Sequence, residues 1–350
     1  MFNLFNKHED SFGLDLTGSS FKLFQLKRQG KNLEVAGYSD VALPKGLLIN
    51  DAVSDAKTFT YLLKQAVLKP QYGKFIGNAV AASLPESKSF VRVIQVPQMK
   101  DSELETAVPS EAESFIPLPI DQVYLDWQKL GLKGDKQEVL IIASPKEFVD
   151  KYLQILESAD LQVSALEVES QSCHRALIPF GLKPNCLIVD LDAFRTSLIM
   201  VEEGNLEFTS SIPIAGTTFT EAIARSLGVS SQKAEMVKRK VGIANTAEYP
   251  NIKTAVLPVL TNLSAEIKNI IKFHAEHSQN KVEKIILAGG SAKLKNLAEN
   301  LQPEFTAEGI IVESGNPWVN LAQIKNPPFD AYDSLSYATA IGLAMRGVIE

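Results

Sequence analysis

The sequence predicts an α/β protein built from two similar halves, because one type of hairpin occurs twice. An apolar strand ending in Asp-Leu, a turn and a hydroxyl-bearing return strand appear at residues 12–26 and again at 186–208. The two strand-end aspartates, Asp15 and Asp190, are 175 residues apart, half of the 350-residue chain. A strand, a Gly-Gly turn and a helix follow at residues 284–301. A repeat at this spacing indicates an internal duplication.

The composition is that of a folded protein without an obvious nucleic-acid or membrane role. Hydrophobic residues make up 45% of the chain and charged residues 22%, which is ordinary for a globular protein. The net charge of −6 argues against attraction to nucleic acid or anionic lipid. No apolar run reaches the ~18 residues that span a bilayer, and the start of the chain lacks the apolar core of a signal peptide. The two cysteines have no metal-binding spacing, so a reducing, cytosolic setting is expected.

The first 85 residues are predicted to form a strand meander, a helix and a further strand. Residues 1–10 are expected to be a loose tail, with a short apolar anchor as the alternative. Residues 12–43 have the alternation of three strands, and 54–68 have helical spacing with Ser54 as the candidate N-cap. Residues 76–84 form another apolar strand.

Residues 86–145 differ in character and predict a small inserted α+β unit. A strand ends at Pro97, and an acidic amphipathic helix at 100–115 is expected to be interrupted by Pro109. Two further strands follow. A helix at 145–158, with Pro145 in its first turn, returns the chain to the main fold.

The rest of the chain is predicted to be a second half with more helices than the first. A helix at 166–178 precedes the second hairpin. Further helices are expected at 219–227, 230–241 and 255–277, and a loop-rich segment at 314–332. The last helix, 334–346, has small residues on adjoining faces, which would permit close approach of another helix.

The turn of the first hairpin has residues suited to phosphate. Gly18 allows the backbone to approach an anion, and the N–H groups of such a turn form an anion-binding nest. Lys22 would neutralise a phosphate, and Asp15 would hold Mg²⁺ through water. On its own, however, such a stretch is more often an ordinary turn.

Together the two hairpins, the Gly-Gly turn and the helix before the second hairpin resemble the actin-like ATPase superfamily. The chain is most similar to the PilM family of type IV pilus assembly, a relative of the cell-division protein FtsA. The resemblance is carried by EAESFIPLPIDQV at 111–123, PIAG at 213–216 and AEMVKR at 234–239. It covers nearly the whole chain. The implied fold is actin-like (ribonuclease-H-like), with duplicated α/β domains and a small inserted α+β subdomain.

The resemblance also implies a division of the chain into domains. Residues 1–85 and 146–184, with the C-terminal helix at 333–350, would form the first actin-like half. Residues 86–145 would form the inserted subdomain typical of PilM and FtsA. Residues 185–332 would form the second half, including a subdomain at about 226–258. In this fold the two halves clamp a nucleotide between their hairpins.

Carried over by position, the resemblance implies a site for ATP and Mg²⁺. Asp15 and Asp190 would hold the metal through water. The residues matching the phosphate-binding segments are Thr17, Gly18, Ser19, Ser20, Lys22, Gly216 and Thr217. Those matching the adenosine site are Gly289, Gly290 and Ser291, together with Glu235 and Lys238, whose i, i+3 spacing lets both point one way from a helix. Glu169 resembles the polar residue that positions water for catalysis.

The second hairpin departs from the family pattern, which is Asp-Ile-Gly followed by Thr. Asp192 stands where a Gly backbone would approach the γ-phosphate. At ~4 Å a carboxylate would repel phosphate by several kcal/mol at intermediate dielectric, unless it bound the metal instead. We therefore expect ATP binding with weak or absent ATPase activity, and the first hairpin would hold most of the phosphate.

The function implied by the resemblance is that of a cytoplasmic scaffold in type IV pilus assembly. Such a scaffold binds the cytoplasmic N-terminal peptide of PilN in a groove between the first half and the insert, and so lies at the inner membrane through its partner. Self-association is left open. The alternatives are an FtsA-like division filament and, with less support, a sugar or acetate kinase. FtsA ends in an amphipathic membrane helix, whereas this sequence stops at GVIE, and no catalytic base or substrate loop of a kinase is found.

Three other features are expected to be structural. His274 and His277 are three residues apart on a helix, and without a third ligand a solvated or helix-end role is expected rather than a metal site. Cys173 is expected to be a buried small apolar residue. The acidic helix at 101–113 is expected to be a solvated face, with a partner surface as the alternative.

Overall fold

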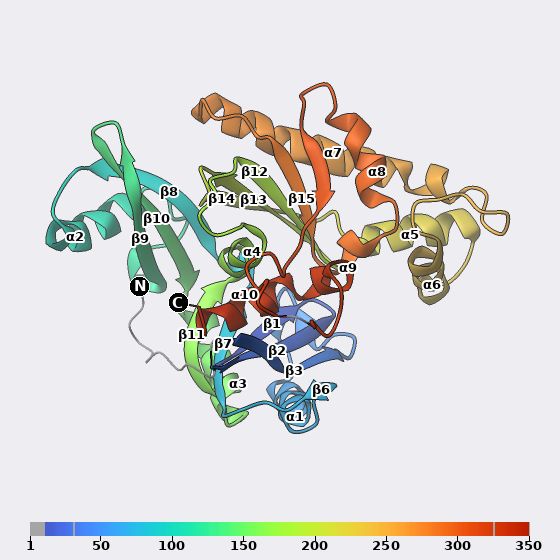
Figure 1. Ribbon diagram of the computed structural model, residues 1–350, viewed down its shortest axis with the longest axis horizontal. Helices are drawn as coiled ribbons and strands as arrows, with labels where there is room; N and C mark the ends of the chain where they lie inside the picture. The colour runs from blue at the N-terminus through green and yellow to red at the C-terminus, as the bar shows by residue number, and fades with distance from the viewer. Residues whose placement is uncertain (1–10, 31, 325, 350) are drawn as a thin grey trace.

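The computed structural model describes residues 11–30, 32–324 and 326–349, so the predicted N-terminal tail lies outside the described residues. Two mixed sheets form the centre of the molecule, one of six strands and one of eight, and helices cover their faces (Figure 1). This architecture confirms the predicted α/β class. No helix within the described ranges combines the length and the apolarity needed to cross a bilayer.

The six-stranded sheet has the order β11 (Gln162–Val168), β7 (Ala79–Leu84), β1 (Phe12–Thr17), β2 (Ser20–Gln29), β3 (Asn32–Ala42) and β6 (Tyr72–Gly73). The meander predicted for residues 12–43 is therefore confirmed. Phe21 and Leu23 face a core that includes α1 (Ala56–Leu68) and α3 (Lys146–Ser158). Phe24 and Leu26 pack against α10 (Ala338–Arg346) on the other face, as strand alternation requires.

The eight-stranded sheet has the order β16 (Ile311–Ser314), β15 (Lys284–Ala288), β12 (Cys186–Leu191), β13 (Thr196–Glu202), β14 (Asn205–Ile212), β8 (Phe90–Pro97), β10 (Lys136–Pro145) and β9 (Val123–Lys133). The helices that belong to this sheet's core are α5 (Gly216–Leu227), α6 (Ser231–Val241), α7 (Ile252–His277) and α8 (Leu297–Leu301). The predicted helices of this region are thus present, with ends shifted by a few residues.

The two sheets repeat one local pattern, as the paired hairpins in the sequence indicate. β1 is antiparallel to β2 and parallel to β7. In the same way β12 is antiparallel to β13 and parallel to β15. Asp15 and Asp190 lie at equivalent places on the central strand of each pattern, close to its C-terminal end.

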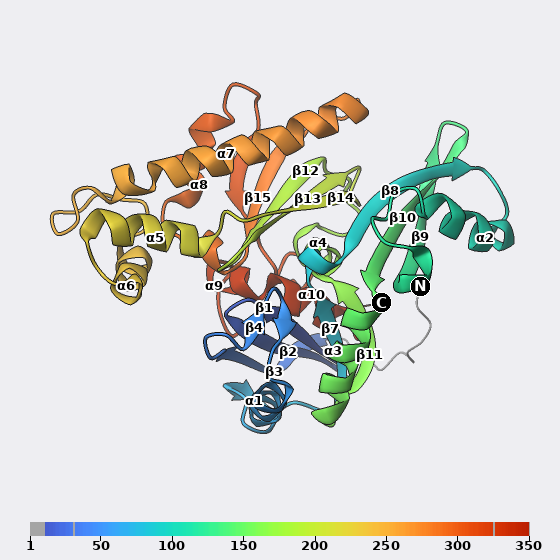
Figure 2. The same cartoon turned by 180° about the vertical axis from the view of Figure 1, so that it is seen from behind.

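The segment 86–145 forms three strands and the helix α2 (Asp101–Ala112), with a hydrophobic core of its own. Its sheet is continuous with that of the second half, because Phe208 of β14 pairs with Arg92 of β8. Figures 1 and 2 show this unit projecting beside the β12–β14 strands. The sequence did not predict this junction, which depends on a single bridge between distant segments.

The C-terminal helix α10 lies between the two sheets and crosses α4 (Glu169–Leu177) closely (Figures 1 and 2). A Cβ added to Gly342 would lie 1.9 Å from the carbonyl oxygen of Ser172. The small residues of the last helix therefore allow the close helix contact that was predicted.

One prediction about α1 and one about α2 are wrong. The N-cap of α1 is Asp55 and not Ser54, since Asp55 Oδ1 accepts hydrogen bonds from Lys57 N at 3.1 Å and Thr58 N at 3.2 Å. Ser54 Oγ instead donates to backbone carbonyls of the preceding loop. Pro109 lies inside α2 without interrupting it. Leu104, Val108 and Ala112 are buried along one helix face, and this packing outweighs the lost backbone hydrogen bond.

The helix predicted at 166–178 begins three residues later, because residues 162–168 form strand β11. This strand pairs in parallel with β7, with Val163 opposite Val80. Residues 166–168 have no strong local preference for a strand, and their pairing with a distant strand decides their conformation.

His274 is buried rather than solvated. Its Nε2 lies 2.8 Å from Glu202 Oε2, and the residue is 2% exposed. The residue lies in the last turn of α7, so its position near the helix end was predicted and its burial was not. Cys173 is fully buried, as expected.

Candidate functional site

The first hairpin ends in a tight turn at residues 17–20, where β1 meets β2. Thr17 Oγ1 donates to Ser20 O at 3.3 Å, and Lys22 Nζ donates to Ser20 Oγ at 3.2 Å. Lys22 is only 5% exposed. The structure therefore brings the predicted phosphate-binding residues of this hairpin together at one turn, with a buried ammonium group beside it.

Asp15 lies near the end of β1, just before this turn, and is 2% exposed. Ser83 Oγ donates to Asp15 Oδ1 at 3.3 Å. Burial raises the pKa of Asp15 to about 7, although the Lys22 ammonium acts in the opposite direction. An additional cation near Asp15 would stabilise its charged form.

Asp190 occupies the equivalent place on β12 and is also buried. Burial raises its pKa well above the usual range, and the negative charges of Asp192, Glu169 and Asp15 raise it further. The two predicted metal-binding aspartates thus belong to one group of acidic side chains between the hairpins. In the part of the chain that the structure describes, no three His, Cys, Asp or Glu side chains are placed to coordinate a metal directly.

Asp192 joins three segments of the second half. Its backbone oxygen accepts hydrogen bonds from Gly216 N and from Ser291 Oγ, both at 2.9 Å. Its carboxylate accepts a longer bond from Gly290 N, at 3.4 Å. The sequence indicated Asp192 as an obstacle to phosphate or, alternatively, as a metal ligand, whereas the structure shows that it also anchors the start of α5 and the Gly-Gly turn.

Gly289 brings the Gly-Gly turn against Asp190. It has φ of 86°, and a Cβ there would lie 2.6 Å from Asp190 Oδ1. A side chain is therefore excluded by both conformation and space. Thr217 N donates to Ala193 O at 2.9 Å, next to the bond that Gly216 makes. The predicted residues of the second hairpin, the start of α5 and the Gly-Gly turn are thus in mutual contact.

Glu235 and Lys238 point the same way from α6, as predicted, but they bind each other. Lys238 Nζ lies 2.7 Å from Glu235 Oε2, and it also donates to Gly216 O at 2.9 Å. Thr220 Oγ1 donates to Glu235 at 2.6 Å. Partial burial alone would raise the pKa of Glu235, but hydrogen bonds from Lys238, Thr220 and Arg239 lower it to about 2. This cluster fixes α6 against the start of α5; contact with a ribose or base stays a prediction.

Arg195, at the second hairpin, is the candidate that sequence analysis missed. Its Nη2 donates to both oxygens of Glu169, at 2.8 and 2.7 Å, and its Nη1 pairs with Asp51. The Arg195 side chain is 12% exposed. Asp51 belongs to the short hairpin formed by β4 (Leu48–Ile49) and β5 (Ala52–Val53). The only signal in the sequence was the unusual run after Asp190, which places an arginine next to the predicted phosphate site.

Phe194 joins the tips of the two hairpins. A Cβ added to Gly18 would lie 2.4 Å from Phe194 Cδ2. Gly18 was predicted to let an anion approach the backbone, and in this structure the group that approaches it is an aromatic ring. Phe194 is still 55% exposed, so it covers the turn from the solvent side.

Glu169, the predicted water-positioning residue, is buried and engaged in the Arg195 ion pair. Its Oε2 also accepts a hydrogen bond from Glu86 N at 3.1 Å. Burial raises the pKa of Glu169 to about 8, while the Arg195 guanidinium acts in the opposite direction. In this arrangement Glu169 is the counter-ion of Arg195, and its role in positioning water stays a prediction.

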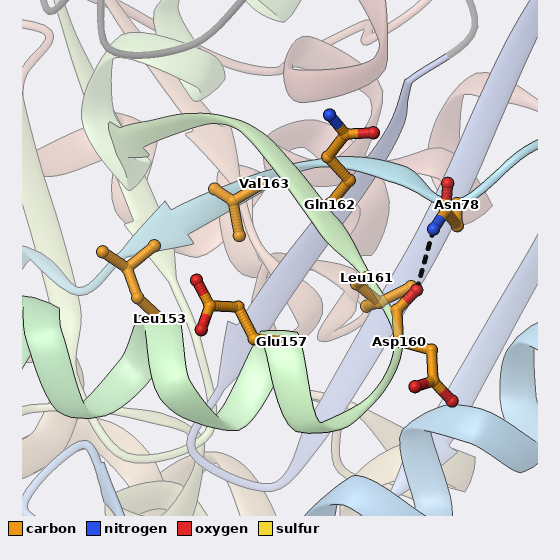
Figure 3. Close-up of a pocket in the computed structure, with 7 residues that line it drawn as sticks. All are labelled: Asn78, Leu153, Glu157, Asp160, Leu161, Gln162 and Val163. Carbon is orange, nitrogen blue, oxygen red and sulfur yellow. Dashed lines mark hydrogen bonds between the residues drawn. The ribbon is translucent and has the colours of Figure 1, made fainter.

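A surface hollow lies apart from these residues. It has a volume of about 620 Å³ and lies where α3 ends and β11 begins (Figure 3). At its edge, Asn78 Nδ2 donates a hydrogen bond to Asp160 O at 2.9 Å. No residue of the insert lines it, and none of the predicted nucleotide-site residues does.

A smaller cavity of about 60 Å³ lies within the first half, next to the insert junction: Pro85, the residue before the insert, lines it, but no residue of 86–145 does. Leu16, Val53, Pro85, Phe148 and Ile155 provide apolar walls, and the remaining lining residues are Asp51, Ala52, Ser83, Lys151 and Tyr152. The Tyr152 hydroxyl is buried and has no hydrogen-bond partner among the described residues. The cavity therefore combines apolar walls with an unsatisfied polar group.

These features define an actin-like protein, in which two related halves face each other with paired hairpins. Similar solved structures include the ethanolamine utilization protein EutJ from Carboxydothermus hydrogenoformans, with 14% identity over 96% of this chain and 89% of that chain and a TM-score of 0.57. MreB 5 of Spiroplasma citri bound to AMPPNP is similar over 95% of this chain and 93% of that chain, with 12% identity and a TM-score of 0.56. These likenesses confirm the predicted fold.

The chain belongs to the type IV pilus assembly protein PilM family, whose sequence model matches residues 13–348. A solved PilM-PilN type IV pilus biogenesis complex is 29% identical, with a TM-score of 0.82 over 97% of this chain and 99% of that chain. The cell division protein FtsA of Bacillus subtilis (strain 168) is 21% identical over 369 residues, which cover 97% of this chain and 83% of that protein. The resemblance to PilM is confirmed, and the family match supports an actin-like scaffold of pilus assembly over the division-filament alternative.

Proposed function

We propose that the protein is a cytoplasmic scaffold that binds Mg²⁺-ATP between its hairpins and the N-terminal peptide of a PilN-like protein beside its insert. Through this peptide it would be held at the inner membrane and link the membrane complex to the cytoplasmic machinery. The observation that carries the nucleotide part is the group of buried carboxylates shared by the two hairpins. The small cavity at the insert junction carries the peptide part.

The residues between the hairpins fit a magnesium nucleotide. Oxygen ligands suit Mg²⁺, which often keeps part of its water shell, and Asp15 and Asp190 would hold it through water. Burial raises the pKa of both carboxylates, because removing a charged carboxylate from water costs free energy. A bound cation would offset this cost. When bound, Mg²⁺ would supply the positive charge that neutralises both the phosphates and these acids.

The remaining contacts to ATP would come from the segments that the structure brings together. The turn at 17–20, Lys22 and the start of α5 would bind the phosphates. The Gly-Gly turn and the Glu235–Lys238 pair would border the adenosine. MreB 5, which has a similar fold, has been solved with AMPPNP bound, which supports a nucleotide as the ligand of this fold.

Hydrolysis is proposed to be slow or absent. Both oxygens of Glu169 are engaged by Arg195, so Glu169 is not free to orient water. Asp192 presents a carboxylate where the γ-phosphate would lie. Phosphate release from Mg²⁺-ATP, measured over hours with the full chain, is expected to stay at the background rate, and multiple turnovers per minute would contradict this.

The small cavity at the junction is proposed to take an apolar side chain of the partner peptide. It is bordered by Pro85, just before the insert, and by Phe148, just after it, so the occupant would bind the first half at the point where the insert is attached. An extended peptide that places one side chain in a pocket is a common recognition mode. The solved relative contains PilN, which supports this class of partner.

Filling the cavity tests the peptide site. Ala52→Leu adds three carbons to a lining residue and is expected to weaken binding of a labelled PilN N-terminal peptide by about tenfold or more, or about 1.4 kcal/mol. Fluorescence anisotropy with the full chain measures this. Ala247→Leu, the same substitution in an exposed loop of the second half, is the control. Equal peptide affinity in both variants would show that the peptide binds elsewhere.

A further inference from the structure

Arg195 connects the second hairpin with two acidic residues of the first half. Its guanidinium binds both oxygens of Glu169 and also pairs with Asp51. The side chains of Arg195 and Glu169 are 12% and 4% exposed. A planar guanidinium with several donors can hold two carboxylates at once, which a lysine ammonium on a flexible stem does not reproduce.

Each of these two acids holds the first turn of the insert. Glu169 Oε2 accepts from Glu86 N at 3.1 Å, and Asp51 Oδ2 accepts from Ser87 Oγ at 2.5 Å. Glu86 in turn accepts from Ser170 N at 3.3 Å. The start of the insert is thus fastened to Arg195 through two separate side chains.

The start of the insert is also fastened to the second sheet. The Thr209 hydroxyl on β14 donates to Glu86 Oε1, and Glu86 is 4% exposed. Burial of this carboxylate raises its pKa, while hydrogen bonds from Thr209 and Ser170 act in the opposite direction. A movement of the second half against the first would therefore act on the insert junction.

The same residues reach both proposed ligand sites. Arg195 follows Phe194, whose ring packs on Gly18 in the first phosphate turn. Asp51 lines the cavity at the insert junction, next to Pro85. A continuous series of contacts therefore runs from the turn where phosphate would bind to the wall of the cavity where the peptide side chain would bind.

We propose that Arg195 is a positioning residue that couples nucleotide binding between the hairpins to peptide binding at the insert junction. Phosphates entering beside the Gly18 turn would displace Phe194 and shift the adjacent Arg195. Asp51 and Glu169, and with them residues 86 and 87, would then move. The inference rests on the proposed function, since it requires both ligands, and it adds the link between them.

Coupling of this kind is reciprocal and measurable. If nucleotide changes the peptide affinity by some factor, the peptide changes the nucleotide affinity by the same factor. Peptide affinity of the full chain would be measured by fluorescence anisotropy without nucleotide and with saturating Mg²⁺-AMPPNP. For the wild-type protein, the peptide dissociation constants with and without nucleotide are expected to differ by a factor of about five or more.

Two substitutions interrupt the proposed link, and one matched substitution leaves it intact. Arg195→Lys keeps the charge but not the double contact. Asp51→Asn removes the charge that holds Ser87, and Asn tolerates the φ of 61° found at Asp51. Arg175→Lys is the control, because Arg175 also pairs with a buried glutamate, Glu167, with 12% and 2% exposure.

The outcomes separate the coupling from the proposed function. Arg195→Lys and Asp51→Asn are expected to bind both ligands with a ratio close to one, while Arg175→Lys keeps the wild-type ratio. Two results would overturn the coupling and leave the proposed function standing. In the first, nucleotide does not change the peptide affinity of the wild-type protein. In the second, nucleotide changes the peptide affinity of Arg195→Lys and of Asp51→Asn as much as it changes that of the wild type. Wild-type protein that fails to bind either ligand would overturn the proposed function and the coupling with it.

Discussion

At the scale of single residues, the site is governed by three buried acids and the half-buried Asp192. Asp15, Asp190, Asp192 and Glu169 all act on one another electrostatically, and burial raises the pKa of Asp15 to about 7 and of Glu169 to about 8. The positive charge of Arg195 attracts all four of these carboxyl groups. Such a group is stable only with positive charge nearby, which is why a metal-bound nucleotide suits it.

Asp15→Asn tests the metal role directly. Removing the carboxylate is expected to weaken Mg²⁺-ATP binding by about tenfold, about 1.4 kcal/mol, because the metal loses a charged partner. The melting temperature without ligand is expected to stay equal or rise, since a buried charge is removed. Calorimetry and thermal melting measure the two effects. Asp135→Asn, in an exposed turn of the insert, is the control, and unchanged affinity in Asp15→Asn would contradict the assignment.

Glu207 gives a pH prediction outside the site. Burial raises its pKa to about 7, and the negative charges of Glu202 and Glu138 add to the shift. Between the ordinary value of 4.5 and about 7, the folded state therefore binds more protons than the unfolded state. The free energy of unfolding contributed by this residue falls as the pH rises through that window.

Glu207→Gln removes this contribution. Relative to wild type, the variant is expected to gain stability between pH 5 and pH 8, and urea unfolding at several pH values measures the difference. Glu111→Gln, on the exposed face of α2, should follow the wild-type curve. A Glu207→Gln profile parallel to wild type would show that the carboxylate has an ordinary pKa.

At the scale of elements, the site depends on close packing of the last helix. α10 crosses α4 where Gly342 faces the backbone of Ser172, and α4 begins at Glu169. The position of α10 therefore determines the position of Glu169, an ion-pair partner of Arg195. A change on α10 should affect the site without touching it.

Gly342→Val is expected to destabilise the protein by about 3 kcal/mol or prevent folding, because the side chain would overlap the α4 backbone. Chemical denaturation followed by circular dichroism measures the loss. Gly131→Val is the control, since the space around Gly131 is open. If both variants were equally stable, α10 and α4 would not be in the close contact described here.

The hairpins and the Gly-Gly turn could be predicted from the sequence because their signals are local. Alternating apolar residues at 12–26 and a short continuous apolar run at 186–189 indicate strands from local sequence alone. β11 could not be predicted in this way, because Val163 gains its conformation by pairing with Val80. Arg195 was missed for the same reason: Glu169 and Asp51 are distant in sequence, and only the folded chain brings them to the hairpin.

At the scale of the whole molecule, the insert is attached on two sides. Its strands extend the second sheet through Phe208 and Arg92, and its first turn is fastened to the first half through Glu169 and Asp51. The proposed division into two halves and an insert at 86–145 therefore describes units that share sheets and side chains. Movement of one half against the other would therefore also displace the insert.

Calorimetric titration of the full chain with ATP and Mg²⁺ tests the central claim most directly. The claim is that the paired hairpins form one nucleotide site. The account predicts a dissociation constant below about 1 mM, corresponding to about −4 kcal/mol, and binding that weakens when Mg²⁺ is removed with a chelator. Affinity weaker than this, or affinity that does not depend on Mg²⁺, would contradict the account.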